Sequence, residues 1–147
     1  MSKIFNSFFS WRVGGFLLGL DVGIKGLGVD LMEIERLKRS VERRGRRLLE
    51  KIFTEEEIRY CFSMGDPYQH LAARFCVKEA VLKAFGIGLG RGVTLRDIEV
   101  KLDELGKPYV EIHGRLKEKA EKSGVTRIIV SMSHSGGYAI AVAILTG

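Results

Sequence analysis

The sequence is poor in cysteine, because Cys61 and Cys76 are its only two in 147 residues. The pair lacks the spacing of a zinc site, and two thiols do not make a disulfide framework. We therefore expect reduced cysteines, with Cys76 buried inside a helix, and a protein that works in the reducing cytoplasm.

Long hydrophobic runs are also missing, so we expect no membrane span. The most apolar stretch, residues 16–20, is interrupted by glycine and followed by Asp21, whereas a spanning helix needs about 20 apolar residues. No small-residue cleavage site follows it, which argues against a secretory signal. We interpret residues 1–25 as an accessory N-terminal extension without an assigned function, with an interfacial membrane anchor as the less favoured alternative.

Linkers and low-complexity segments are absent too, and the composition fits one globular domain over residues 26–147. Hydrophobic residues make up 46% of the chain and charged residues 29%, a balance typical of a soluble protein with its own core. Lysine and arginine number 24 against 18 acidic residues, a formal net charge of +6. This excess favours an anionic partner: nucleic acid, an anionic membrane, an acidic protein or a phosphorylated ligand.

A basic helix is expected over residues 31–44, after a short strand over residues 26–30 that ends on Asp30. One helix face is apolar, and the other carries Arg36, Lys38, Arg39, Arg43 and Arg44. No aromatic residue is interleaved with these cations, and glutamates interrupt them, so the stacking platforms and unbroken positive groove of a nucleic-acid site are missing. The helix favours an acidic docking partner, with a solvated charged face as the open alternative.

A long helix over residues 66–86 is the centre of the expected fold. Asp66 can cap its start, Pro67 suits its first turn and Gly86 can end it. Its apolar residues recur at helical spacing and predict one buried stripe. Shorter helices are expected over residues 48–53 and 54–63, the second opened by a capping box.

The second half of the chain predicts strands, because apolar and polar residues alternate there. The strands are expected over residues 97–103, 109–113, 126–133 and 137–145, with a short helix over residues 115–123. The fold class is α+β, with an antiparallel sheet packed around the long central helix.

Two loops resemble catalytic motifs only in part. Glycine occupies every second position from Gly86 to Gly92, but neither a dinucleotide fingerprint nor a Walker lysine motif is present. A flexible exit turn is favoured, with a backbone that approaches a ligand as the alternative. Ser133 and His134 are neighbours without a G-x-S-x-G elbow, so a polar turn is favoured over hydrolase catalysis.

Asp30 and Glu79 are carboxylates inside apolar runs, and burying either one without a cation would be costly. Two carboxylates, completed by water and phosphate oxygens, are a usual way to hold magnesium. Lys83 lies one helical turn after Glu79, where it could neutralise a phosphate. From the residues alone, structural ion pairing is the favoured interpretation and a magnesium–phosphate site is the alternative.

Three segments form a combination that is more specific than any one of them. They are G-V-D-L-M-E-I-E-R over residues 28–36, R-F-C-V-K-E-A-V-L-K-A-F-G over residues 74–86, and S-M-S-H over residues 131–134 followed by Y-A-I-A. This combination resembles the bacterial holo-acyl-carrier-protein synthases, the small class of phosphopantetheinyl transferases, from about residue 24 to the C-terminus. Residues 1–25 have no counterpart in that family.

The resemblance implies an enzyme that moves 4′-phosphopantetheine from coenzyme A to a serine of apo acyl carrier protein, for fatty acid biosynthesis, and releases adenosine 3′,5′-bisphosphate. Asp30 and Glu79 would bind Mg²⁺, and Lys83 would contact the phosphates of coenzyme A. Glu79, directly or through a water molecule, is the candidate general base.

The resemblance also implies a homotrimer with its sites between subunits. Gly86 and His134 match positions that line the nucleotide pocket, and Arg74 would reach coenzyme A bound chiefly by a neighbouring subunit. Arg36 and Arg43 match positions on the helix that docks the acidic carrier protein. Two rival functions remain: a basic nucleic-acid-binding module, and a carrier-protein adaptor that has lost its chemistry.

Overall fold

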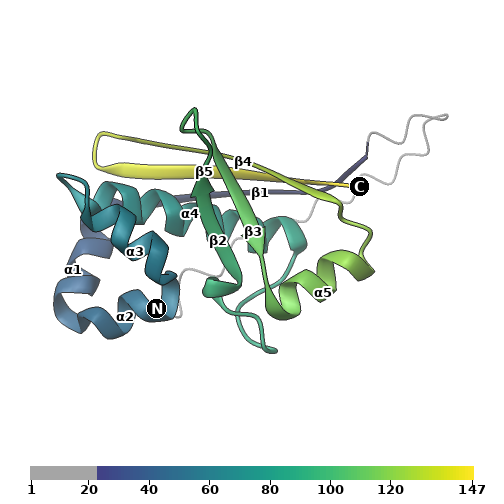
Figure 1. Ribbon diagram of the computed structural model, residues 1–147, viewed down its shortest axis with the longest axis horizontal. Coiled ribbons are helices and arrows are strands. Elements are labelled where there is room, and N and C mark those ends of the chain that lie inside the picture. Colours follow the sequence, from purple (N-terminus) through teal and green to yellow (C-terminus); the bar gives the residue numbers. More distant parts are fainter. Residues whose placement is uncertain (1–22) are drawn as a thin grey trace.

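A long helix lies against a three-stranded antiparallel sheet in the computed structural model, which describes residues 23–147 (Figure 1). The predicted extension over residues 1–25 therefore lies almost wholly outside the described residues. In chain order the elements are β1 (Ile24–Glu33), α1 (Ile34–Arg44), α2 (Arg46–Ile52), α3 (Glu55–Phe62), α4 (Pro67–Phe85), the short 3₁₀ helix η1 (Leu95–Asp97), β2 (Ile98–Leu102), β3 (Pro108–Ile112), α5 (Gly114–Lys122), β4 (Arg127–Ser135) and β5 (Tyr138–Thr146).

The strands form two antiparallel sheets, in the orders β1-β5-β4 and β2-β3. The predicted α+β class is confirmed, although the single expected sheet is divided into two. β2, β3 and α5 match the predicted segments to within one residue at each end. None of the helices within residues 23–147 is both long enough and apolar enough to cross a bilayer.

Helix α4 forms the core of the fold. Asp66 caps it by accepting a hydrogen bond from the Tyr68 backbone N–H at 3.0 Å, and Gly86 ends it with a φ of 66°. All residues from 71 to 82 are buried, because the helix packs on β1, β4 and β5 and also on α1, α3 and β2. The predicted apolar stripe is buried, but burial extends beyond it: residues 71–82 are enclosed on all sides, with charged side chains inside the core.

The backbone of β1 lies unusually close to α4. A Cβ atom at Gly26 would overlap the carbonyl oxygen of Ala84, and one at Gly28 would overlap that of Ala80. Only glycine permits this approach at both positions. Because every second residue of a strand points to the same side, Asp30 also faces the helix.

The start of the first helix differs from the prediction over residues 31–44, because α1 begins only at Ile34. β1 continues through Glu33, since β5 is long enough to pair with it as far as Tyr138. Leu31 follows the alternation of Val29 and is 60% exposed on the outer face of the sheet. The pairing partner, and not the local sequence, decides where the strand ends.

The connection between the last two strands is also tighter than predicted. The turn was expected at residues 134–136, but β4 runs to Ser135 and pairs His134 with Ala139. Only Gly136 and Gly137 remain in the turn, and both have a positive φ, as two-residue hairpin turns require. His134 is therefore part of a strand and not of a polar loop.

Candidate active site

Three predicted site residues meet where the end of β1 crosses α4. Asp30 is 7% exposed and Glu79 6% exposed. The Lys83 Nζ atom donates a hydrogen bond to Asp30 Oδ1 at 2.9 Å and another to the Val29 carbonyl at 3.1 Å. Glu79 and Lys83 lie one turn apart on α4, so a half-buried ammonium group stands beside two buried carboxylates.

The charges at this site do not balance within the chain. Burial first, and then the Asp30 carboxylate, raise the pKa of Glu79 to about 7, while Lys83 acts in the opposite direction. One ammonium group cannot neutralise two ionised carboxylates. The pair therefore either holds a proton or attracts a further cation, which is the environment expected of a metal or phosphate-transfer site.

Cys76 lies next to this site, on the face of α4 that meets the sheet. Its Sγ atom is 3.5 Å from the Ala139 carbonyl oxygen. Burial and the nearby Asp30 carboxylate raise the pKa of the Cys76 thiol, and burial raises the pKa of Cys61 to about 11. Both cysteines are free and buried, as the sequence predicted for Cys76.

Arg74 lies in the N-terminal half of α4, and His134 meets the same part of the helix through His70. Arg74 Nη1 donates to the His70 carbonyl at 3.4 Å, and its guanidinium stacks over the Tyr60 ring at 4.5 Å. The His70 and His134 rings meet edge to face at 6.2 Å. At about 1.5 Å per residue, α4 separates Arg74 from Lys83 by roughly 13 Å along its axis and half a turn around it. Within one chain, the Arg74–His134 group, which we name the second half-site, is therefore separate from Lys83.

Burial, followed by the charges of Arg74 and His134, lowers the pKa of His70. His70 is thus held neutral within the second half-site, where it packs between Tyr60 and His134. The Nε atom of Arg74 is buried and has no hydrogen-bond partner within residues 23–147.

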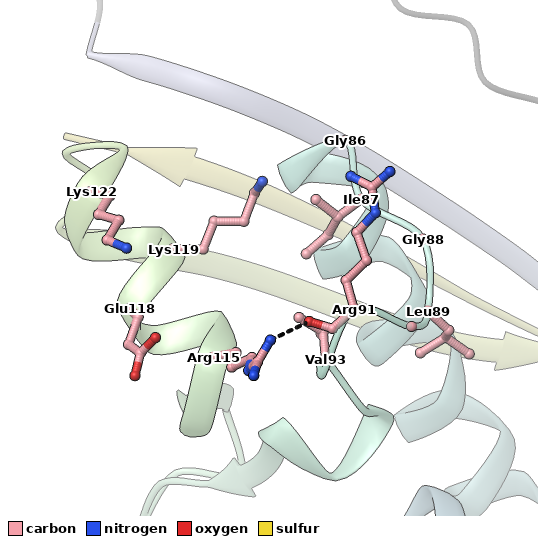
Figure 2. A pocket seen from close by; sticks show the side chains of 11 residues that line it. Gly86, Ile87, Gly88, Leu89, Arg91, Val93, Arg115, Glu118, Lys119 and Lys122 are labelled. Carbon is pink, nitrogen blue, oxygen red and sulfur yellow. Dashed lines mark hydrogen bonds between the residues drawn. The ribbon is translucent and has the colours of Figure 1, made fainter.

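The remaining predicted residues lie at two separate surfaces. Gly86 ends α4 one turn after Lys83 and lines a cleft of about 650 Å³ together with the glycine-rich loop and α5 (Figure 2). Arg36 and Arg43 are exposed on α1, which directly follows the strand that carries Asp30.

Lys78 and Glu57 form a buried network that the sequence analysis missed. Lys78 Nζ lies 2.8 Å from Glu57 Oε2, and both side chains are at most 1% exposed. Glu57 also completes the predicted capping box with Thr54 and accepts a hydrogen bond from the Val100 N–H at 2.9 Å. The other acceptors of the Lys78 ammonium are the carbonyl oxygens of Ile52, Leu95 and Ile98. Burial lowers the pKa of Lys78 and Glu57 raises it.

A second group of acidic and histidine side chains lies on the β2–β3 hairpin. Glu99, Glu111 and His113 place their ligand atoms within 4.8 Å of one another. The Lys101 ammonium, however, lies 3.2 Å from Glu99 and 3.0 Å from Glu111. This cluster differs from the carboxylates of α4 and β1, because its lysine contacts both carboxylates and Glu111 is exposed to solvent.

The fold and the carboxylate–lysine site define a phosphopantetheinyl transferase. A family model described as the 4′-phosphopantetheinyl transferase superfamily matches residues 26–143, and the chain belongs to that superfamily. Within it, the chain is similar to the holo-[acyl-carrier-protein] synthase of Ruminiclostridium cellulolyticum, with 47% identity over 121 residues that cover 82% of this chain and 90% of the relative. The resemblance found in the sequence is thereby confirmed.

Solved structures of holo-[acyl-carrier-protein] synthases share the fold. The enzyme from Neisseria meningitidis superposes with a TM-score of 0.78 at 32% identity, covering 84% of this chain and 99% of that one. The enzyme from Helicobacter pylori, solved in complex with coenzyme A, gives a TM-score of 0.73 at 29% identity, covering 82% and 99% of the two chains.

Proposed function

We propose that this protein transfers 4′-phosphopantetheine from coenzyme A to a serine hydroxyl of apo acyl carrier protein and releases adenosine 3′,5′-bisphosphate, in the service of fatty acid biosynthesis. The observation that carries the proposal is the convergence of Asp30, Glu79 and Lys83 in a chain of this family. Relatives named holo-[acyl-carrier-protein] synthase and a related structure with coenzyme A support the choice of substrates.

The two buried carboxylates fit a magnesium ion. Asp30 and Glu79 offer hard oxygen ligands and carry more negative charge than Lys83 can balance. When bound there, Mg²⁺ would supply positive charge to the oxygens of a diphosphate. Water and phosphate oxygens would complete its ligands.

The side chains of this chain account for the remaining chemistry. As the serine oxygen bonds to the phosphorus next to pantetheine, the bond from that phosphorus to the adenosine side breaks, and the electron pair leaves with adenosine 3′,5′-bisphosphate. Lys83 would neutralise the phosphate oxygens during this exchange. Glu79, directly or through a metal-bound water molecule, is our candidate for the group that accepts the serine proton.

We infer that the protein acts as a homotrimer with its site between subunits. The outer face of the β1-β5-β4 sheet supports this assembly, because large apolar side chains are exposed on it: Ile24, Leu27, Val29, Leu31, Ile129 and Ile140. The separation of the second half-site from Lys83 also supports it, since a neighbouring subunit can supply that half-site. The two free, buried cysteines support a cytoplasmic location.

Neither rival function has comparable support. A nucleic-acid-binding module would leave the buried carboxylates beside Lys83 without a use, and an adaptor that had lost its chemistry would not need Asp30, Glu79 and Lys83 held together.

Mass spectrometry of a purified apo carrier protein tests the function. Incubation with coenzyme A, Mg²⁺ and this protein should add the mass of one 4′-phosphopantetheine group, and the Asp30→Asn variant should add none. An unchanged carrier mass, under conditions in which a related synthase modifies the same carrier, would contradict the proposal.

The exposed basic face of α1 should bind the acidic carrier. Arg36→Glu is expected to raise the KM for carrier protein by about tenfold or more and leave the KM for coenzyme A nearly unchanged. Lys117→Glu makes the same charge change at an exposed position of α5, and it should have little effect. Steady-state kinetics with each substrate varied provides the measurement. An equal rise in both KM values would show that Arg36 does not act by binding the carrier protein.

A further inference from the structure

A groove with an apolar floor, which we name the α1–α3 groove, is lined by residues of helices α1, α2 and α3 and by Tyr68. Figure 1 shows these three helices gathered at one end of the molecule. The floor is formed by Val41, Leu49, Ile58, Phe62 and Tyr68. Phe62 is 48% exposed, and the groove has a volume of about 670 Å³. A half-exposed aromatic ring beside such a space leaves room for a further apolar group.

The rim of the α1–α3 groove carries charges that cancel. It holds two glutamates and two arginines, namely Glu42, Glu55, Arg46 and Arg59. Arg46 Nη2 lies 2.7 Å from Glu55 Oε2, so one pair of opposite charges is already joined. A rim without net charge does not attract an acidic protein or a nucleic acid, since both favour an excess of cations. The α1–α3 groove therefore suits an uncharged, apolar occupant.

Residues 4–11 of the same chain have this chemistry. Their sequence is I-F-N-S-F-F-S-W, without a charged side chain. Ile4, Phe5, Phe8 and Phe9 recur with the three- and four-residue spacing that is typical of one helix face. An amphipathic helix enters an apolar groove with this pattern. The family match begins only at residue 26, so the domain shared with the relatives does not account for these aromatic residues.

The chain between this segment and β1 is long enough to reach the groove. β1 begins at Ile24 and leads directly into α1, which contributes Val41 to the floor. At about 3.3 Å per residue β1 covers roughly 30 Å, and α1 adds about 10 Å before Val41. The chain from Phe9 to Gly23 can extend to about 46 Å, which exceeds the sum of these two lengths.

We propose that the α1–α3 groove is the docking site for residues 4–11 of the same chain, with the phenylalanine side chains on its floor. Burial of their apolar surface favours docking. The covalent connection to β1 keeps the segment at a high effective concentration near the groove, so modest contacts are sufficient. The exposed apolar face of the β1-β5-β4 sheet is the rival position for the segment, and the test separates the two.

Disulfide trapping in the full chain tests the position of the segment. Both native cysteines are buried, so they do not compete under mild oxidation. Phe8→Cys is combined with Phe62→Cys in the groove. The comparison pairs combine Phe8→Cys with Leu105→Cys at the 94% exposed hairpin tip, or with Val29→Cys on the outer face of the sheet.

The Phe62 pair should form a disulfide within one chain about tenfold faster than either comparison pair, because docking raises the local concentration of the two thiols. Equal rates for the three pairs would overturn the proposal. A faster reaction of the Val29 pair, or a disulfide that joins two chains, would overturn it as well.

Trp11 is the only tryptophan of the chain, and its fluorescence reports docking without a cross-link. Acrylamide should quench it less in the full chain than in a synthetic peptide of residues 1–22. Phe62→Lys should weaken docking about tenfold or more and bring the quenching close to that of the peptide. Leu105→Lys makes the same change at the hairpin tip and should leave the quenching as it is in the wild type.

A second variant guards against an effect of Phe62→Lys on folding. Phe8→Lys lies outside residues 23–147 and should raise the quenching of Trp11 to the same extent. The proposal is overturned if Trp11 is quenched equally in the wild type and in the peptide, or if Phe62→Lys behaves like Leu105→Lys. Neither measurement depends on transferase activity.

Discussion

Replacing Glu79 with glutamine is expected to abolish transfer and yet to stabilise the metal-free protein. Burial and Asp30 raise the pKa of Glu79 from 4.5 to about 7. Between these two pH values, Glu79 keeps its proton in the folded state and loses it in the unfolded state. Stability should therefore fall as pH rises from about 4.5 to 7. Above that window, the ionised carboxylate would cost roughly 3 kcal/mol, and a neutral glutamine avoids this cost.

Urea unfolding in the presence of a chelator measures the stability effect. At pH 8 the Glu79→Gln variant should be more stable than the wild type at equal protein concentration, and the difference should shrink towards pH 4.5. Transfer should fall by about a thousandfold. A variant that is less stable at pH 8, or one with near-normal turnover, would show that Glu79 is an ordinary structural residue.

Mixing subunits of two inactive variants tests whether the site lies between subunits or within one chain. Glu79→Gln and His134→Ala should each be nearly inactive alone, because each damages a different half-site. In randomly mixed trimers, about a quarter of the interfaces would join an intact Glu79 to an intact His134. Partial recovery of activity is expected, and a complete lack of recovery would argue for a site within one chain.

The second large effect is expected at Lys78, whose ammonium is fully buried with Glu57. Lys78→Met removes the cation and leaves the Glu57 carboxylate inside the core. Breaking a buried ion pair in this way costs about 3–5 kcal/mol, which is a large share of the stability of a small domain. Urea unfolding, or the loss of soluble protein, should report this change.

A double substitution separates the lost ion pair from lost packing. Lys78→Met/Glu57→Gln leaves neither member of this pair charged and should recover part of the stability lost by Lys78→Met alone. Lys117→Met, at an exposed lysine of α5, should change stability little. If Lys78→Met were as stable as Lys117→Met, the network would have no structural role.

The central helix and the carboxylates were accessible from the sequence because their signals are local. Asp66, Pro67 and Gly86 mark the ends of α4, and the G-x-D and K-E-A-x-x-K-A segments identify Asp30 and Glu79 without knowledge of the fold. The start of α1 was not accessible, since Leu31 fits both a helical stripe and a strand alternation. Pairing with β5 decides between them.

The Lys78–Glu57 pair and the division of the site depend on contacts between distant segments. A charged residue amid apolar neighbours signals a buried partner, but nothing in the sequence identifies Glu57 of α3 as that partner. Helical spacing alone indicates that Arg74 and Lys83 face different directions. Where each one points depends on how α4 lies between the sheet and the other helices.

The order of strands in the larger sheet bears on how the protein is made. β1 carries Asp30 and is the first strand within residues 23–147, and its ladder partner β5 is the last strand of that range. During synthesis, β1 can pair with β5 only after residues 138–146 have left the ribosome. The carboxylates of the site come together only at that point, so an incomplete nascent chain should have no transferase activity.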